Sequence, residues 1–269
     1  MLISSPESES FRLSELSVDF CLMMFTNELD EHPLRSFLDG KDVHETSKKI
    51  AVFFLIYFYF VKDGPKWMRL RPAFNLNPHL LIYNGYQFGV HVVGFLLVLW
   101  TTQWGVTSWS CTALDYKDVK SFFVVYVIYV FLWAKIMECL ETVMHILMKK
   151  RRHIQLIEVF RTFANFGLVH IGLKYPNNLM TFYPLIDLFV GIFIFWYNTL
   201  QSAGVNLKIR GFWDKFIFIL RLLEFCALFS HGMFIINLST CDLPRFLSIY
   251  ECLFAFLNLV MICSYYSYS

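Results

Sequence analysis

Long apolar runs constrain the fold of this chain more than any other feature of its sequence. Seven of them approach the ~20 residues that a helix needs to cross a bilayer: 47–62, 80–101, 120–145, 154–173, 181–203, 212–236 and 245–266. Hydrophobic residues make up 57% of the chain and charged residues only 16%, against about 45–50% and about 25% in soluble domains. The sequence therefore predicts an all-α fold, a polytopic membrane helix bundle of about seven transmembrane helices.

The domain organisation follows from the same runs. Residues 1–46 mix Glu, Asp, Ser and Lys and are expected to form a polar lumenal leader, and residues 47–269 are expected to form the seven-span membrane domain. The first run is short, and the fourth contains Glu158, Arg161 and Asn165. If both insert, the two ends of the chain lie on opposite sides of the membrane.

Lysine and arginine residues predict the orientation of the bundle. The loops at 62–79, 146–153 and 204–215 hold eleven of them, whereas the loops at 102–119, 174–180 and 237–245 hold three. Because cytosolic loops are enriched in Lys and Arg, we expect the first set in the cytosol, with a lumenal N-terminus and a cytosolic C-terminus. Lys48 and Lys49 oppose this orientation but are outnumbered.

Six of the seven cysteines divide into two groups. Cys111 and Cys241 fall in two of the loops assigned to the oxidising side, so a disulfide between them is expected. The four that fall inside spans are expected to act as small buried hydrophobic residues: Cys139, Cys226, Cys252 and Cys263.

Ionisable residues are concentrated in the stretch 135–162. Lys135, Glu138 and Thr142 are spaced i, i+3 and i+7 and so share one helix face, and Glu158 and Arg161 repeat the i, i+3 pairing. Charge in an apolar segment is costly and usually faces a bundle interior or a cavity. This stretch is therefore a candidate functional site.

Several motifs, in their order and spacing, resemble those of one known family. They are Gly64-Pro65-Lys66-Trp67-Met68, Arg71-Pro72-x-Phe74, Tyr83-Asn84, Cys111 with Asp115-Tyr116, Lys135-x-x-Glu138-x-x-Glu141-Thr142, Lys149-Lys150, Gln201-Ser202-Ala203-Gly204, and Cys241 with Pro244. From about residue 60 to 266 the chain resembles the ELO family of very-long-chain fatty acid elongases, which are membrane 3-ketoacyl-CoA synthases. The two cysteines match lumenal positions that carry a disulfide in that family.

The resemblance implies condensation of long-chain acyl-CoA with malonyl-CoA in the endoplasmic reticulum membrane, with six helices around a narrow tunnel for the acyl chain. It implies no cofactor. The partners it implies are acyl-CoA, membrane lipid, and homo- or hetero-oligomers with other elongase-pathway proteins, and no nucleic acid. The implied substrate-binding positions are Lys135, Glu138, Glu141, Thr142, Lys149, Lys150, Asp187, Tyr197, Arg221 and Glu224.

The chain departs from the family at the residues that carry its chemistry. The H-x-x-H-H box of the family aligns with Glu158-Val159-Phe160-Arg161-Thr162, which holds no histidine. The histidine of the next motif is replaced by Gly191, and the glutamines of a sixth-helix motif are replaced by Arg221 and Glu224. The histidine that often follows is kept, as His231.

These departures predict lost or strongly reduced catalysis. Condensation needs a nucleophile to carry the acyl group and donors to stabilise the enolate left by decarboxylation, and imidazole can do both near neutral pH. An ionised Glu158 cannot donate a proton, and Arg161 cannot act as a base. The degenerate positions Glu158, Arg161, Thr162 and Gly191 thus offer no clear catalytic residue, and His231 is the candidate substitute.

Two functions fit this sequence. The first is an elongase by descent with weakened condensation, and the second is a non-catalytic protein that binds acyl lipid or pairs with active elongases. In the second, Lys135, Arg161 and Arg221 and the carboxyls of Glu138, Glu141, Glu158, Asp187 and Glu224 simply fill the former site. A transporter or receptor would predict Gly- or Pro-broken helices in paired halves, which we do not find.

Overall fold

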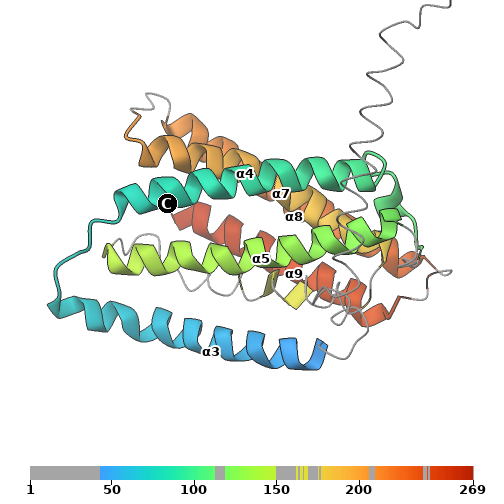
Figure 1. Ribbon diagram of the computed structural model, residues 1–269. Helices are drawn as coiled ribbons and strands as arrows, with labels where there is room; N and C mark the ends of the chain where they lie inside the picture. Colours follow the sequence, from blue (N-terminus) through green and yellow to red (C-terminus); the bar gives the residue numbers. More distant parts are fainter. Residues whose placement is uncertain are drawn as a thin grey trace, which may run out of the picture. The chain divides into compact units, whose positions relative to one another are not determined.

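The computed structural model describes residues 43–112, 119–149, 177–205, 210–238 and 243–268, together with 162, 164, 165, 167, 168, 175 and 241 (Figure 1). The chain divides into two compact units, Met1–Phe53 and Phe54–Ser269. The first described helix, α3 (Val43–Trp67), begins in the first unit and ends in the second. The candidate site and the disulfide lie in the second unit.

The second unit is built from long helices. Beyond the end of α3 these are α4 (Asn77–Thr101), α5 (Val119–Leu147), α7 (Phe182–Ser202), α8 (Arg210–Asn237) and α9 (Arg245–Tyr268), with the short 3-10 helices η1 (Met68–Leu70), η2 (Thr107–Trp109) and η4 (Asn178–Thr181). Helix α4 packs against α5 and α7, α7 packs against α8, and α8 packs against α9. The part of the chain that the structure describes contains no strand, and the prediction of an all-α fold is confirmed.

Five of the helical segments are long and apolar enough to cross a membrane, namely 77–101, 123–147, 178–202, 211–237 and 245–264. They coincide within a few residues with five of the seven predicted runs. The predicted run at 47–62 falls within α3, and most of the run at 154–173 lies outside the described residues. The chain is a polytopic helical membrane protein, as predicted.

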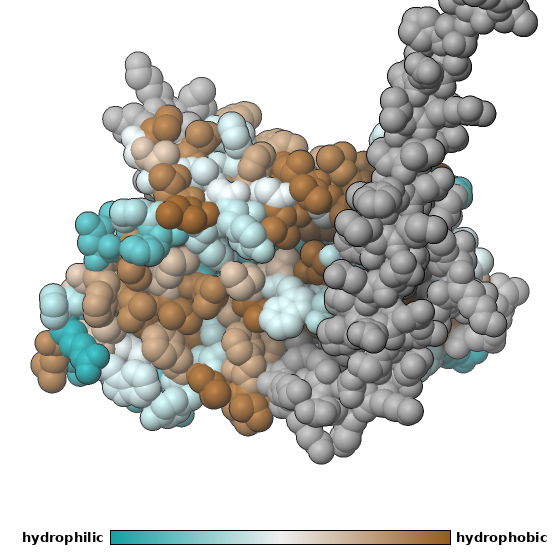
Figure 2. All heavy atoms as spheres, in the orientation of Figure 1, coloured by the Kyte–Doolittle hydropathy of each residue, from teal (hydrophilic) through white to brown (hydrophobic). Residues whose placement is uncertain are grey.

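Helix α4 shows how the membrane environment shapes the bundle. Its exposed large side chains are Ile82, Tyr86, Val93, Leu96 and Trp100, each 57–72% exposed. Its buried face carries Asn84, Gln87 and His91, each at most 1% exposed. A surface helix of a soluble protein has the reverse arrangement. Figure 2 shows apolar side chains over much of the described surface on this face of the molecule, as a lipid-facing surface requires.

The C-terminal end of α7 is hydrogen-bonded to α4. Helix α7 ends where Gly204 adopts a φ of 75°, the left-handed conformation that commonly ends helices. The Gly204 N–H donates to Gln201 O at 3.2 Å, which satisfies one of the last carbonyls. Ser202, two residues before Gly204, accepts a hydrogen bond from the side-chain amide of Asn84 at 3.0 Å. This bond joins α4 to the last turn of α7.

A disulfide joins Cys111, in the α4–α5 connection, to Cys241, in the α8–α9 connection, with a Cα–Cα distance of 5.6 Å across 130 residues of sequence. This is the pair that the sequence and the family resemblance predicted. It packs beside an apolar cluster at this end of the helices, formed by Leu179, Met180, Ile235 and Leu247. The bond therefore ties two connections together over a solid part of the core.

Candidate functional site

An ionic network joins α5, α7 and α8 inside the second unit. Lys135, on α5, is 3% exposed, and its Nζ lies 2.6 Å from Glu138 Oε1 and 2.6 Å from Asp187 Oδ2. On α8, Arg221 Nη1 lies 2.7 Å from Glu224 Oε2 and 3.7 Å from Asp187 Oδ1. Asp187 thus lies between both cations, and the network links three helices through α7.

The network contains three carboxyls and two cations among the described residues. A buried ion pair is a weak source of stability, but removing one partner commonly costs about 3–5 kcal/mol because the other charge stays buried and uncompensated. With two positive and three negative formal charges, the network has one excess negative charge. A further negative charge in this region would therefore be poorly accommodated.

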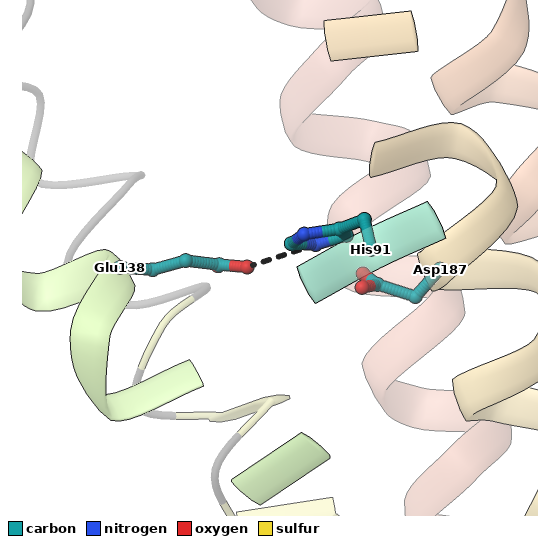
Figure 3. A group of neighbouring side chains, drawn as sticks. All are labelled: His91, Glu138 and Asp187. Atoms are coloured by element: carbon teal, nitrogen blue, oxygen red, sulfur yellow. Dashed lines mark ion pairs between the residues drawn. The ribbon is translucent and has the colours of Figure 1, made fainter. Parts of the chain in front are cut away.

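The side chain of His91 on α4 lies beside the network, and reasoning from the sequence did not select it. Its Nε2 lies 3.8 Å from Glu138 Oε1, and its ring packs against Phe195 with centroids 4.6 Å apart. Figure 3 shows His91, Glu138 and Asp187 pointing toward one another from three helices. A polar stripe at Asn84, Gln87 and His91, spaced i, i+3 and i+7 in an apolar span, was the available signal.

The tautomer of His91 follows from its hydrogen bond. Its Nδ1 lies 2.8 Å from the backbone oxygen of Gln87. A carbonyl oxygen only accepts, so Nδ1 carries the proton, and in the neutral ring Nε2 carries the lone pair. His91 is fully buried, and its Nε2 has no hydrogen-bond partner among the residues that the structure describes. Such an unsatisfied buried nitrogen is rare in proteins and calls for an explanation.

Gly191 on α7 makes room for this imidazole. A Cβ added at Gly191 would lie 2.1 Å from His91 Cδ2 and 2.6 Å from its Nε2. Any side chain at position 191 would therefore collide with the ring. The position at which the family pattern has a histidine is a glycine here, and a histidine from the neighbouring helix occupies the adjacent space.

The donor atoms of His91, Glu138 and Asp187 all lie within 4.8 Å of one another, which is close enough for a metal site. However, the ammonium group of Lys135 already lies 2.6 Å from each of the two carboxylates. A metal ion would have to displace that cation from both partners. The donor set as arranged is satisfied by Lys135 and does not fit a metal.

The other predicted site residues fall into three places. Glu141 and Thr142 continue along α5 and are half-buried. Tyr197 lies on α7 away from the ion pairs, where its hydroxyl donates to Asp214 Oδ1 at 3.0 Å. Lys149 is exposed at the end of α5, and its Nζ donates to Arg69 O at 3.5 Å.

The aligned histidine box is only partly described. Thr162 is helical and half-buried. Glu158 and Arg161, and the expected ion pair between them, lie outside the described residues, as does Lys150.

His231, the candidate substitute, lies in a separate cluster near the disulfide. Its Nδ1 is 2.9 Å from Glu251 Oε1 and its Nε2 is 3.2 Å from Ser108 O. Its ring stacks on Phe182 at a centroid distance of 4.1 Å. Both ring nitrogens are engaged, and Glu224 lies two turns, about 10 Å, away along α8. The structure gives His231 a role in joining α8, α9 and η2, and does not bring it to the ionic network.

The amino-acid sequence of the chain is similar to those of several known proteins. The chain is 26% identical over 198 residues to very long chain fatty acid elongase 4 of Macaca mulatta, a match that covers 71% of this chain and 62% of that protein. It is 27% identical over 215 residues to very long chain fatty acid elongase 7 of Rattus norvegicus, covering 76% and 75% of the two chains. For very long chain fatty acid elongase 1 of Homo sapiens the identity is 26% over 194 residues, covering 70% and 68%.

The chain thus spans less than two thirds of the length of the elongase 4 relative. A family-wide comparison covers more of the chain, since residues 43–269 match the model of the ELO: GNS1/SUR4 family. That range includes α3 and every residue of the ionic network. The chain belongs to the ELO (GNS1/SUR4) family.

Proposed function

We propose that this protein binds long-chain acyl-CoA in the endoplasmic reticulum membrane and that its condensation with malonyl-CoA is lost or strongly reduced. Membership of the family, and relatives named as very long chain fatty acid elongases, support acyl-CoA as the ligand class. The observation that carries the loss of catalysis is the close approach of His91 to Gly191. Position 191 cannot hold an imidazole while His91 occupies that space.

The charges of the network support the same conclusion. Condensation generates an enolate, and an enzyme accelerates such a step with donors aimed at the developing negative charge. Here Lys135 and Arg221 each already have a carboxylate at 2.6–2.7 Å. Three carboxyls face two cations, so a further anion gains little stabilisation from the described residues.

A second function, a non-catalytic partner of active elongases, is favoured by the ion pairs themselves. A network of this kind stabilises a bundle without any chemistry as long as every partner is present. The two functions differ in one observable property. The weakened elongase forms a trace of 3-ketoacyl product by itself, whereas the partner protein forms none and changes the rate of another elongase.

The test is incorporation of radiolabelled malonyl-CoA by the purified protein, beside a variant that restores the box with Glu158→His, Arg161→His, Thr162→His and Gly191→His. Because the last change needs space, it is combined with His91→Ala. Acyl-CoA binding by both proteins serves as the folding control. We expect binding by both and a gain of product, about a hundredfold or more, in the restored variant. Product formation by the unmodified protein at the level of a histidine-bearing relative contradicts the proposal.

A further inference from the structure

The unsatisfied nitrogen of His91 suggests chemistry that the lost histidine box no longer supplies. The bond from Nδ1–H to Gln87 O at 2.8 Å directs the lone pair of Nε2 into the ionic network. Nothing in the described part of the protein donates a hydrogen bond to that nitrogen. A neutral imidazole with a free lone pair is a competent nucleophile for acyl transfer.

The oxygen Oε1 of Glu138 marks a position where a reacting carbonyl oxygen could lie. It is 2.6 Å from Lys135 Nζ and 3.8 Å from His91 Nε2. A carbonyl oxygen at that position would accept a hydrogen bond from the ammonium group. Its carbon, about 1.2 Å from the oxygen, would lie about 3.3 Å from Nε2 when the nitrogen approaches the carbonyl obliquely, as nucleophilic attack requires, which is a near-attack distance.

Glu138 is the member of this group that can yield its position. Its side chain is 16% exposed, against 3% for Lys135 and 2% for Asp187. If the Glu138 carboxylate turns toward its exposed side, Lys135 keeps its 2.6 Å contact with Asp187. The ammonium then remains in place as the donor to an incoming oxygen.

A small apolar cavity lies near the ring. One turn along α4 from His91, a cavity of about 20 Å³ lies between α4, α5 and α7, with Gly94, Phe131 and Leu188 in its lining. Its lining also includes Val90 and Ala134, the neighbours of His91 and Lys135 in sequence. One of these apolar side chains, Phe131, lies close to the proposed donor, with Lys135 Nζ 5.0 Å from its ring centroid.

We propose that His91 is an acyl acceptor, whose Nε2 takes the acyl group from a long-chain acyl-CoA thioester with Lys135 as the donor to the carbonyl oxygen. This rests on the proposed function in one respect, the binding of acyl-CoA. It goes beyond it because it assigns a nucleophile and a half-reaction that does not require malonyl-CoA.

The step balances without a further reactant. Nε2 uses its lone pair to form the N–C bond, and the C–S bond breaks with its electron pair on sulfur, so CoA leaves as the thiolate. The acylated ring carries one positive charge, and its Nδ1–H still donates to the Gln87 carbonyl oxygen. The carboxylate of Glu138 returns to face that charge. Water later cleaves the N–C bond to give the fatty acid and a proton, which matches the proton that the thiolate takes up.

The same geometry explains why acyl transfer to His91 would not be followed by condensation with malonyl-CoA. The oxyanion of acylation uses the single position next to Lys135 that Glu138 vacates. Once Glu138 has returned to the acylated ring, Lys135 and Arg221 again have carboxylate partners. The described residues then offer an enolate no open cation.

A nearby thiol is the rival acceptor. Cys139 lies one turn after Lys135 on α5, is 1% exposed, and its Sγ is 3.9 Å from Lys135 O. Thiols accept acyl groups from thioesters by exchange. The matched control for His91→Gln is therefore Cys139→Ala, which removes the rival without touching the imidazole.

The experiment mixes the full-length protein in lipid nanodiscs with palmitoyl-CoA, without malonyl-CoA, and follows CoA release by rapid quench. We expect a burst of about one CoA per protein, an acyl adduct mapped by mass spectrometry to the peptide with His91, and full retention of both in Cys139→Ala. In His91→Gln the burst slows by about a hundredfold or more, while palmitoyl-CoA binding stays within about threefold.

Three results overturn the inference: palmitoyl-CoA binding without CoA release, a burst that persists in His91→Gln, or an adduct on Cys139. If His91→Gln does not fold, the adduct site in the unmodified protein decides alone. Failure of the proposed function is recognised separately. It shows as absent palmitoyl-CoA binding or, in the assay with radiolabelled malonyl-CoA, as abundant 3-ketoacyl product.

Discussion

The imidazole of His91 and the bare backbone of Gly191 are complementary, since a Cβ at position 191 would lie 2.1 Å from His91 Cδ2. Helices α4 and α7, which pack against each other, are thereby fitted together beside the ionic network. In the family pattern the histidine belongs to the position of Gly191. In this protein the imidazole comes from the opposite side of the contact.

This complementarity predicts a strong coupling between positions 91 and 191. Gly191→Ala should destabilise the protein by about 1–3 kcal/mol through overpacking, although alanine favours a helix over glycine. Combining it with His91→Ala should remove most of that penalty. Thermal unfolding in detergent measures both. The control is Gly85→Ala on α4, where nothing lies within 4 Å of the added methyl and where stability should hold or rise. Additive effects at 91 and 191 would contradict the contact.

The ionic network predicts a large penalty for removing its central cation. Lys135→Met should cost about 3–5 kcal/mol, because Glu138 and Asp187 would stay buried without their shared partner. Adding Asp187→Asn should recover part of the loss. Lys66→Met is the matched control, since the exposed pair Lys66–Asp63 at 2.8 Å contributes about 1 kcal/mol or less. Equal losses of stability in Lys135→Met and Lys66→Met would contradict the prediction that the buried carboxylates depend on Lys135.

The disulfide predicts a substantial contribution to stability from outside the site. Replacing Cys111 and Cys241 by serine should cost about 4–5 kcal/mol in the chain-entropy picture, because the bond closes a long loop. Cys226 is an exposed free cysteine, and Cys263 is also exposed, so the prediction that both are buried is wrong. Cys226→Ser should change the melting temperature little. Mass spectrometry of non-reduced protein should find the Cys111 and Cys241 peptides linked. Free, alkylatable thiols at both positions in protein from its native membrane would disprove the bond.

The basic turn predicts a salt-dependent contribution to CoA binding. Neutralising Lys149 together with residues 150–152 removes four adjacent cations, each worth about 1 kcal/mol toward anionic groups near a membrane surface. We expect weaker acyl-CoA binding and a smaller dependence on salt. Titration calorimetry in nanodiscs of neutral lipid separates this effect from attraction to anionic headgroups. Unchanged binding there would leave the turn with a role in topology alone.

Much of the fold could be predicted because one physical constraint dominates it. A bilayer demands apolar runs of fixed length, so the helices around Val98, Leu188 and Leu247 were readable from composition alone. The ion pairs were anticipated through residues such as Lys135 and Asp187, whose cost inside a membrane marks them as interior. The orientation of the chain and its location in the endoplasmic reticulum stay predictions.

His91 could not be predicted in the same way. It is a neutral residue on a helix read mainly for its apolar character, and its importance depends on how α4 and α7 pack at Gly191. Sequence spacing gives the face of each helix but not which residues meet across two faces. For the same reason His231 was a candidate substitute from its place after the family motif, whereas its actual partners, Glu251 and Ser108, come from other segments.

The most direct test of the central claim is a single-turnover measurement on the unmodified protein. Radiolabelled long-chain acyl-CoA is bound first, malonyl-CoA is then added, and CoA release and 3-ketoacyl product are quantified in the same quenched samples. Weakened condensation predicts that the product forms at least about a hundredfold more slowly than in a histidine-bearing relative, although acyl-CoA is bound. Product formation within about tenfold of that relative would contradict it.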